Sequence, residues 1–324
     1  MHILVTGAAG FLGNKLARQL LDKDALIGPD GQPEKITRIT LCDVAAPAGP
    51  RDPRIQIVTG DISDPATIAS ALTADVRTIF HLAAIVSGHA EADFDLGMKI
   101  NFDATRRMLE RIRSLGTQPR LVFTSSVAVF GGELPAKVPD TMSPMPQSSY
   151  GAQKAMCELM INDFSRKGFV DGRIARLPTI SVRPGAPNKA ASSFASGIIR
   201  EPLNGQPAVC PVDGDTRMWL MSPRMAVRNL IHAAELDAAR LDGNRTISLP
   251  GLCVTVRGMV DALEDVAGPE AAQKIQWRQD ETVKRIVNSW PGDFDARRAL
   301  SLGFTADADF AGIISAYMQD ELAS

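Results

Sequence analysis

A glycine-rich turn near the start of the chain constrains its fold more than any other feature of the sequence. An apolar run of strand length, residues 2–6, is followed by Gly7, Gly10 and Gly13 in a GxxGxxG spacing, and an amphipathic stretch comes next. Glycines in such a turn let backbone N–H groups approach a pyrophosphate, and the start of the following helix attracts the anion. The triplet alone says little, but its place between strand and helix favours a binding site over a plain turn. We therefore predict that Gly7, Gly10, Phe11, Leu12 and Gly13 contact a dinucleotide.

The first two-thirds of the chain alternate short apolar runs with amphipathic stretches, which is the pattern of βαβ units around a parallel sheet. Strands buried on both faces are expected at residues 2–6, 38–42, 55–59, 78–81, 120–124 and 172–177. Helices are expected at residues 12–21, 65–71, 101–114 and 149–166, with residues 94–101 leading into the third. Residues 28–33 are typical of a surface loop. The pattern predicts an α/β fold with a doubly wound parallel (Rossmann) sheet.

Regularity fades after residue 177, where prolines interrupt the pattern, and helices are expected again at residues 224–237, 256–267 and near the C-terminus. A chain of 324 residues is long enough for one large domain and a smaller lobe. We predict that residues 1–176 form a nucleotide-binding domain that also carries the catalytic residues. Residues 177–324 would form mainly a substrate-binding lobe, with some segments returning to the first domain.

Acidic and small residues at the ends of the next strands suit one cofactor in particular. A carboxylate at Asp43, where the second strand ends, can accept hydrogen bonds from the adenosine ribose and would repel a 2′-phosphate, so it favours NAD over NADP. Asp61 follows the third strand near the expected adenine, and small residues after the fourth let a cofactor cross the sheet edge. A solvated Asp43 and a turn-capping Asp61 remain the alternatives. The predicted contacts are Asp43, Asp61, Ile62, Leu82, Ala83 and Ala84.

Tyr150 and Lys154 form the sharpest catalytic motif. Four residues apart on an expected helix, they lie on one face within reach of each other. A free tyrosine has a pKa of about 10, and a neighbouring cation would lower the pKa of Tyr150 toward the range of a working base. Ser126, at the end of an expected strand, would hold the reacting oxygen against the phenol. The GxSxG elbow expected of a Ser/His/Asp hydrolase is not found, which disfavours that class of enzyme.

These motifs together resemble the extended short-chain dehydrogenase/reductase superfamily, which includes nucleotide-sugar epimerases and dehydratases. The resemblance rests on the GxxGxxG turn, HLAA at residues 81–84, VFTSSVAVFG at residues 122–131 and YGAQK at residues 150–154. It implies that Ser126 is the catalytic serine and Tyr150 the general acid/base. Lys154 would bind the nicotinamide ribose as well as tune Tyr150, and Asn101 would support the proton relay.

The same resemblance implies further contacts and an assembly. Pro178 and Thr179 would lie beside the nicotinamide of NAD. Extended relatives often form homodimers through a four-helix bundle that includes the catalytic helix, and the apolar face of residues 149–166 permits this. Two other functions stay open: a nucleotide-sugar epimerase or dehydratase that retains its NAD, and a non-catalytic NAD-binding regulator. The regulator is disfavoured because serine, tyrosine and lysine are all present.

Two segments depart from the nucleotide-sugar pattern. RMWLMSP at residues 217–223 keeps an arginine but lacks the usual trailing acid, and RLPTISVRPG at residues 176–185 replaces a Phe-Asn segment. Residues 183–203 resemble a branch of the superfamily that oxidises small sugar acids, which implies oxidation of D-erythronate at C2 to 2-keto-D-erythronate. A carboxylate needs a cation or several hydrogen-bond donors. The predicted substrate contacts are Arg217, Ser87, Ser193, Ser126 and Tyr150, with a surface ion pair as the alternative for Arg217 and loop solvation for Ser87 and Ser193.

Composition points to small-molecule chemistry. The formal net charge of −2 gives no basic field for nucleic acid or an anionic membrane. The four cysteines and four histidines show no metal-ligand spacing, so no metal is expected. The N-terminus lacks the features of a signal peptide, and no apolar run is long enough to span a bilayer. We therefore expect a soluble, cytoplasmic enzyme.

Overall fold

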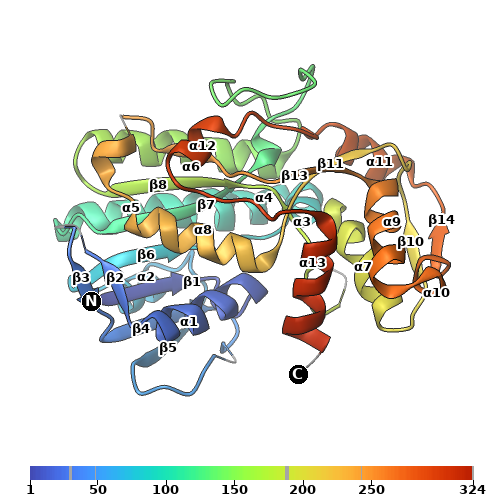
Figure 1. Ribbon diagram of the computed structural model, residues 1–324. Helices are drawn as coiled ribbons and strands as arrows, with labels where there is room; N and C mark the ends of the chain where they lie inside the picture. The colour runs from blue at the N-terminus through green and yellow to red at the C-terminus, as the bar shows by residue number, and fades with distance from the viewer. Residues whose placement is uncertain (29–30, 48, 187–189, 242, 323–324) are drawn as a thin grey trace.

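A computed structural model describes residues 1–28, 31–47, 49–186, 190–241 and 243–322. Its centre is a seven-stranded parallel sheet in the order β12-β8-β7-β6-β1-β4-β5 (Figure 1). The strands are β1 (His2–Thr6), β4 (Arg38–Asp43), β5 (Ile55–Thr59), β6 (Val76–His81), β7 (Arg120–Ser126), β8 (Asp171–Leu177) and β12 (Thr246–Ser248). The strand order reverses between β1 and β6, which opens a crevice at their carboxyl ends. The expected doubly wound sheet is confirmed.

Helices cover both faces of this sheet (Figure 1). On one face lie α1 (Phe11–Lys23) and α8 (Pro223–Glu235), and between them and the sheet is an apolar core that includes Leu16, Leu20 and Leu230. On the other face lie α2 (Pro65–Ala71), α5 (Ala104–Leu115) and α6 (Ser149–Arg166), over a second core that includes Met108 and Ile161. Buried aliphatic contacts on both faces therefore fix the sheet edge that carries the site.

The structure differs from the sequence expectation in three places. β5 is an edge strand with no fully buried residue, because only β4 pairs with it. The loop expected at residues 28–33 joins a small hairpin of β2 (Ala25–Ile27) and β3 (Pro33–Lys35), and residues 29–30 of it lie outside the described residues. The helix expected from residue 101 begins earlier, as α4 (Phe94–Gly97) continues through the π-helix η1 (Met98–Asp103) into α5.

The region after residue 177 is more regular than its prolines suggest. One small sheet joins β9 (Thr179–Ile180), β11 (Arg217–Met221) and β13 (Leu252–Thr255), and another pairs β10 (Ala208–Cys210) with β14 (Ile275–Trp277). With them pack α7 (Phe194–Leu203), α9 (Val256–Ala267) and α13 (Phe310–Tyr317), around a separate apolar core that includes Ile198, Met259 and Ile313. This lobe lies at the right of Figure 1.

Shorter elements complete the chain. They are α3 (Ser87–Ala92), α10 (Pro269–Ala272), α11 (Glu281–Asn288), α12 (Arg297–Ser301), the 3-10 helices η2 (Val127–Val129), η3 (Ala191–Ser193) and η4 (Ala238–Leu241), and the π-helix η5 (Met318–Leu322). Both β12 and α8 follow residue 177, yet β12 is a strand of the large sheet and α8 packs against that sheet. The two units are therefore interleaved in sequence. The division into residues 1–176 and 177–324 stays a prediction.

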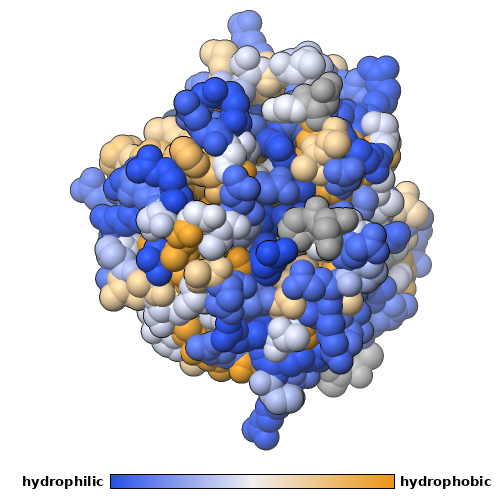
Figure 2. All heavy atoms as spheres, turned by 90° about the vertical axis from the view of Figure 1, so that its left-hand side faces the viewer, coloured by the Kyte–Doolittle hydropathy of each residue, from blue (hydrophilic) through white to orange (hydrophobic). Residues whose placement is uncertain are grey.

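One face of the large unit is mainly polar. Figure 2 shows the left-hand side of Figure 1, where hydrophilic residues predominate and hydrophobic ones appear in small separate groups. No helix within the described ranges is both long and apolar enough to cross a membrane.

Candidate active site

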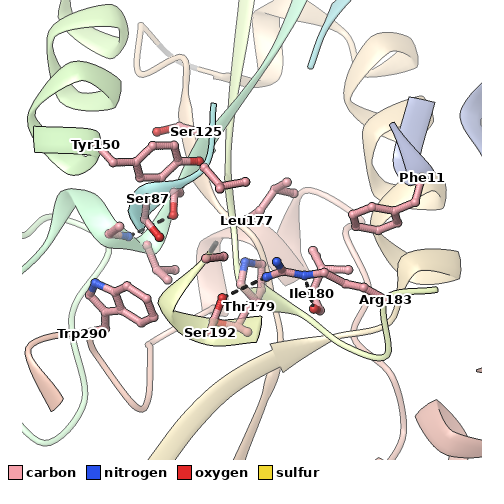
Figure 3. A pocket seen from close by; sticks show the side chains of 16 residues that line it. Phe11, Ser87, Ser125, Tyr150, Leu177, Thr179, Ile180, Arg183, Ser192 and Trp290 are labelled. Carbon is pink, nitrogen blue, oxygen red and sulfur yellow. Dashed lines mark hydrogen bonds between the residues drawn. The ribbon is translucent and has the colours of Figure 1, made fainter. Parts of the chain in front are cut away.

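Tyr150 and Ser126 face one small cavity at the carboxyl edge of the large sheet. The cavity has a volume of about 170 Å³ and lies where the smaller lobe meets the ends of β7 and β8 (Figure 3). Ser126 ends β7, and its hydroxyl accepts a hydrogen bond from the backbone N–H of Ala128 at 3.1 Å. Ser87, Thr179 and the ring of Trp290 also line it. Two hydroxyl groups of different acidity thus share a site of small-molecule size.

The position of Tyr150 depends on how α6 begins. Ser148 caps the helix, and its hydroxyl accepts a hydrogen bond from the N–H of Gly151 at 3.2 Å. Gly151 packs directly on the turn that follows Ser126, because a Cβ there would lie 2.1 Å from the carbonyl oxygen of Ala128. Any larger residue at position 151 would push Tyr150 away from Ser126. Gly151 is a functional position that the YxxxK motif does not reveal.

Burial and charge act on Tyr150 in opposite directions. Burial raises the pKa of Tyr150 to about 12, against the charge of Arg183 and hydrogen bonding by Ser126, which both lower it. Lys154 is not the cation that counters burial. Its Nζ donates a hydrogen bond to the carbonyl oxygen of Thr124 at 2.8 Å and lies 5.7 Å from the centre of the Tyr150 ring. Burial lowers the pKa of Lys154 to about 8.

A buried ion pair lies behind the catalytic residues. Glu158, two turns after Tyr150 on α6, accepts hydrogen bonds from Arg176 of β8 at 2.9 and 2.6 Å, and the hydroxyl of Ser125 donates to the same carboxylate at 2.5 Å. The side chains of Glu158 and Arg176 are only 3% and 7% exposed. The pair ties α6 to the strands that end at the cavity.

Asn101 contacts the side of α6 next to the stripe of Tyr150, through Gln153 and Cys157. Its side-chain nitrogen donates to Oε1 of Gln153 at 2.8 Å, and its oxygen accepts from the backbone N–H of Ile85 at 2.9 Å. Its backbone oxygen accepts hydrogen bonds from Thr105 and Cys157. The structure therefore places Asn101 as a buried link between α6 and the loop after β6, at a distance from the cavity lining.

The crevice between β1 and β6 forms a second cavity, of about 390 Å³. A Cβ at Gly7, whose φ is +71°, would lie 2.7 Å from the backbone nitrogen of Ala83, and one at Gly13 would lie 2.4 Å from the carbonyl oxygen of Gly7. Only glycine lets the turn approach β6 and α1 this closely. A dinucleotide fits such a cradle, since its pyrophosphate needs direct access to the backbone.

Most of the predicted cofactor contacts converge on this crevice. Asp43 accepts a hydrogen bond from the N–H of Ala9 at 2.9 Å, and Asp61 pairs with Lys99 at 3.0 Å. The predicted residues that line the crevice are Gly7, Gly10, Asp43, Asp61, Ile62, Leu82, Ala83 and Ala84. The cavity beside Tyr150 is lined instead by Phe11, Pro178 and Thr179. Leu12 packs against the core under α1, and Gly13 lies where the start of α1 closely approaches Gly7 and Ala8 of the turn.

Two predicted substrate contacts lie away from the cavity. Arg217 begins β11 with its side chain 46% exposed, where it pairs with Asp293 at 3.2 Å and contacts the sulfur of Cys253. Ser193 does not line the cavity, whereas its neighbour Ser192 does. The cavity is also lined by Ser192, Arg183 and Trp290, for which the sequence analysis predicted no role. A motif search could have found Arg183, because it stands within the RLPTISVRPG segment.

Comparison with known proteins gives consistent matches. The model of the NAD dependent epimerase/dehydratase family matches residues 3–241. A D-erythronate dehydrogenase of Cupriavidus necator is 57% identical over 320 residues, which cover 99% of this chain and 98% of that protein. A D-erythronate dehydrogenase of Haemophilus influenzae is 46% identical and covers 99% of this chain and all of its own length. A solved structure described as a nucleoside-diphosphate-sugar epimerase from Agrobacterium tumefaciens superposes with a TM-score of 0.94 at 46% identity, over 100% of this chain and 95% of that one.

Proposed function

Because the chain belongs to the NAD dependent epimerase/dehydratase family, we propose that it oxidises the C2 hydroxyl of D-erythronate to 2-keto-D-erythronate with Tyr150 as the base. It is an NAD-dependent dehydrogenase, and sugar acids are its substrate class. The finer assignment is supported by near-full-length similarity to two D-erythronate dehydrogenases. The observation that carries it is the cavity that Tyr150 and Ser126 share. Its volume of about 170 Å³ is below the roughly 300–1,000 Å³ usual for larger ligands, so it suits a four-carbon acid.

In the proposed mechanism the hydroxyl groups of Ser126 and Tyr150 have different roles. The glycine turn at Gly7, Gly10 and Gly13 would hold NAD, which would supply the acceptor for the hydride from C2 of the substrate. Ser126 hydrogen-bonds the C2 oxygen and holds it against Tyr150. The Tyr150 phenolate takes the proton of the C2 hydroxyl as the C2–H electron pair leaves with its hydrogen, so the C2–O single bond becomes the carbonyl of the 2-keto acid. Lys154 lies outside the cavity lining, with its Nζ hydrogen-bonded to the carbonyl oxygen of Thr124 and 5.7 Å from the centre of the Tyr150 ring, and so adds a buried positive charge near the base.

NADH formation tests the proposal directly. The purified chain with NAD should produce NADH rapidly with D-erythronate, weakly with L-threonate and not at all with nucleotide sugars. Tyr150→Phe should lower kcat by at least about 10²-fold while NAD binding persists, because only the proton transfer is removed. Conversion of a nucleotide sugar without net NADH would instead favour the epimerase alternative. NAD binding with no turnover of either substrate class would favour the regulator.

Assembly and location complete the proposal. A homodimer through α6 is supported by Leu159 on that helix, whose side chain is 72% exposed. Light scattering behind size exclusion should give twice the chain mass, and Leu159→Glu should shift it toward the monomer. A cytoplasmic location is supported by Cys42, Cys157, Cys210 and Cys253, all free thiols, as a reducing compartment favours. Cell fractionation tests it.

A further inference from the structure

The wall of the cavity beside Tyr150 carries one kind of charge. Among the described residues that line it, Arg183 alone has an ionised side chain, and the others are apolar, aromatic or hydroxyl-bearing. In Figure 3 the guanidinium of Arg183 enters from the side opposite Tyr150, with Ser192 beside it. A cavity with a single cation and no acid on its described wall is suited to an anionic ligand.

Arg183 is held in place by neutral groups only. Its Nε donates to the carbonyl oxygen of Ile180 and its Nη2 to the hydroxyl of Ser192, both at 2.9 Å. Within the described part of the chain, Nη1 makes no hydrogen bond and no carboxylate lies within ion-pair distance of the guanidinium. Arg176 and Arg200, nearby in sequence, are each paired with a glutamate. A partly buried guanidinium without a counter-ion is costly, and a bound anion offsets that cost.

We infer that Arg183 binds the carboxylate of the sugar acid, through Nη1 and the remaining N–H of Nη2. This inference rests on the proposed function, because it names the group that orients the substrate for oxidation at C2. In a 2-hydroxy acid the carboxylate carbon is bonded directly to the carbon that is oxidised. The cation that binds it must therefore line the same small cavity as Tyr150, as Arg183 does and Arg217 does not.

Arg183 also acts on the base itself. Its charge is the largest of the effects that lower the pKa of Tyr150 against burial, and burial in turn lowers the pKa of Arg183. Any fixed cation at this position would lower the pKa of Tyr150, so the pH profile tests where the charge lies, and the preference for a carboxylate tests what the charge binds. Two separate readouts follow: selectivity for a carboxylate, and the pH at which activity rises.

The first experiment compares Arg183→Gln with Arg217→Gln, the exposed arginine outside the cavity. We expect Arg183→Gln to raise KM for D-erythronate about 10- to 100-fold, the range of a lost charge-assisted hydrogen bond, whereas Arg217→Gln leaves it unchanged. The preference of the wild type for D-erythronate over its neutral amide, D-erythronamide, should collapse in Arg183→Gln. The rise of kcat/KM with pH should move to higher pH in the same variant. An unchanged KM and an unchanged acid-to-amide preference would overturn the inference, whatever the effect on stability.

A binding experiment separates this inference from the proposed reaction. Calorimetry with D-erythronate uses the NAD complexes of Tyr150→Phe and of Tyr150→Phe/Arg183→Gln, neither of which needs to turn over. Binding to the single variant that is lost in the double variant supports the role of Arg183, even if the wild type forms no NADH and the proposed reaction fails. Equal binding to both, or binding to neither, overturns it. NAD affinity and melting temperature of each variant, expected to match between the two, exclude misfolding as the cause.

Discussion

Replacement of Glu158 by Gln should destabilise the chain strongly although it removes no atom from the core. The carboxylate is 3% exposed and accepts both hydrogen bonds of the Arg176 fork, so the amide leaves the Arg176 charge buried and uncompensated. Breaking a buried pair by removing one partner costs about 3–5 kcal/mol. Because Gln still offers one acceptor and the guanidinium also lies 4.7 Å from the centre of the Phe130 ring, we expect the lower end, about 3 kcal/mol.

The matched control is Glu110→Gln on α5. Glu110 pairs with Arg106 one turn away, but their side chains are 48% and 39% exposed, and an exposed pair at this spacing contributes only about 0.3–0.5 kcal/mol. Urea unfolding followed by circular dichroism gives both free energies of unfolding. The reasoning is refuted if Glu158→Gln costs no more than Glu110→Gln. The double variant Glu158→Gln/Arg176→Met should recover much of the loss, since it removes the stranded charge.

Three further predictions concern the nucleotide side of the molecule. Burial lowers the pKa of His81 to about 3, so the unfolded chain takes up a proton there below about pH 6.5 that the folded chain does not. His81 alone should therefore lower stability by about 2 kcal/mol between pH 7 and 5, and His81→Gln should remove that share of the fall in urea titrations, leaving the share of His2, whose pKa burial lowers to about 4. Asp43→Ser should raise KM for NAD about tenfold and increase the relative use of NADP, which initial rates with both cofactors measure. Gly13→Ala should abolish NAD binding in calorimetry because of the 2.4 Å approach to Gly7, whereas Gly197→Ala, whose new Cβ would have no neighbour closer than 3.5 Å, should leave it intact.

The large sheet could be predicted because its strands carry a local signal. Parallel strands covered on both faces are continuous apolar runs, and five of the six expected strands contribute buried residues to the clusters that flank the sheet. β5 was placed correctly, but its burial was wrong because the sequence does not show which strand ends a sheet. β12 was missed, since it has only three residues and joins the sheet edge by pairing with Ile174–Arg176 of β8, which lie far away in the chain.

The smaller lobe could not be predicted in the same way. β9 has two residues and pairs with β11 across a long separation in sequence, so periodicity carries almost no information there. Side-chain direction within such a strand decides what reaches the cavity. Arg217 stands at the exposed start of β11, and Arg183 follows β9 where the chain turns back toward Tyr150. The sequence resemblance identified residues 176–185 as important for the substrate, and only the fold shows that Arg183 of this segment lines the cavity.

Helix α6 explains why the catalytic spacing and the stability of the chain are coupled. Tyr150, Lys154 and Glu158 are four residues apart, so they form one stripe that drifts slowly around the helix. The first faces the cavity, the second bonds the carbonyl of Thr124 on β7, and the third pairs with Arg176 on β8. Rotation of α6 cannot move one of these contacts without the others. Lys154 therefore contributes to the site in two ways. It carries a charge, and its Nζ holds α6 in place by a hydrogen bond to the carbonyl oxygen of Thr124 rather than to the phenol of Tyr150.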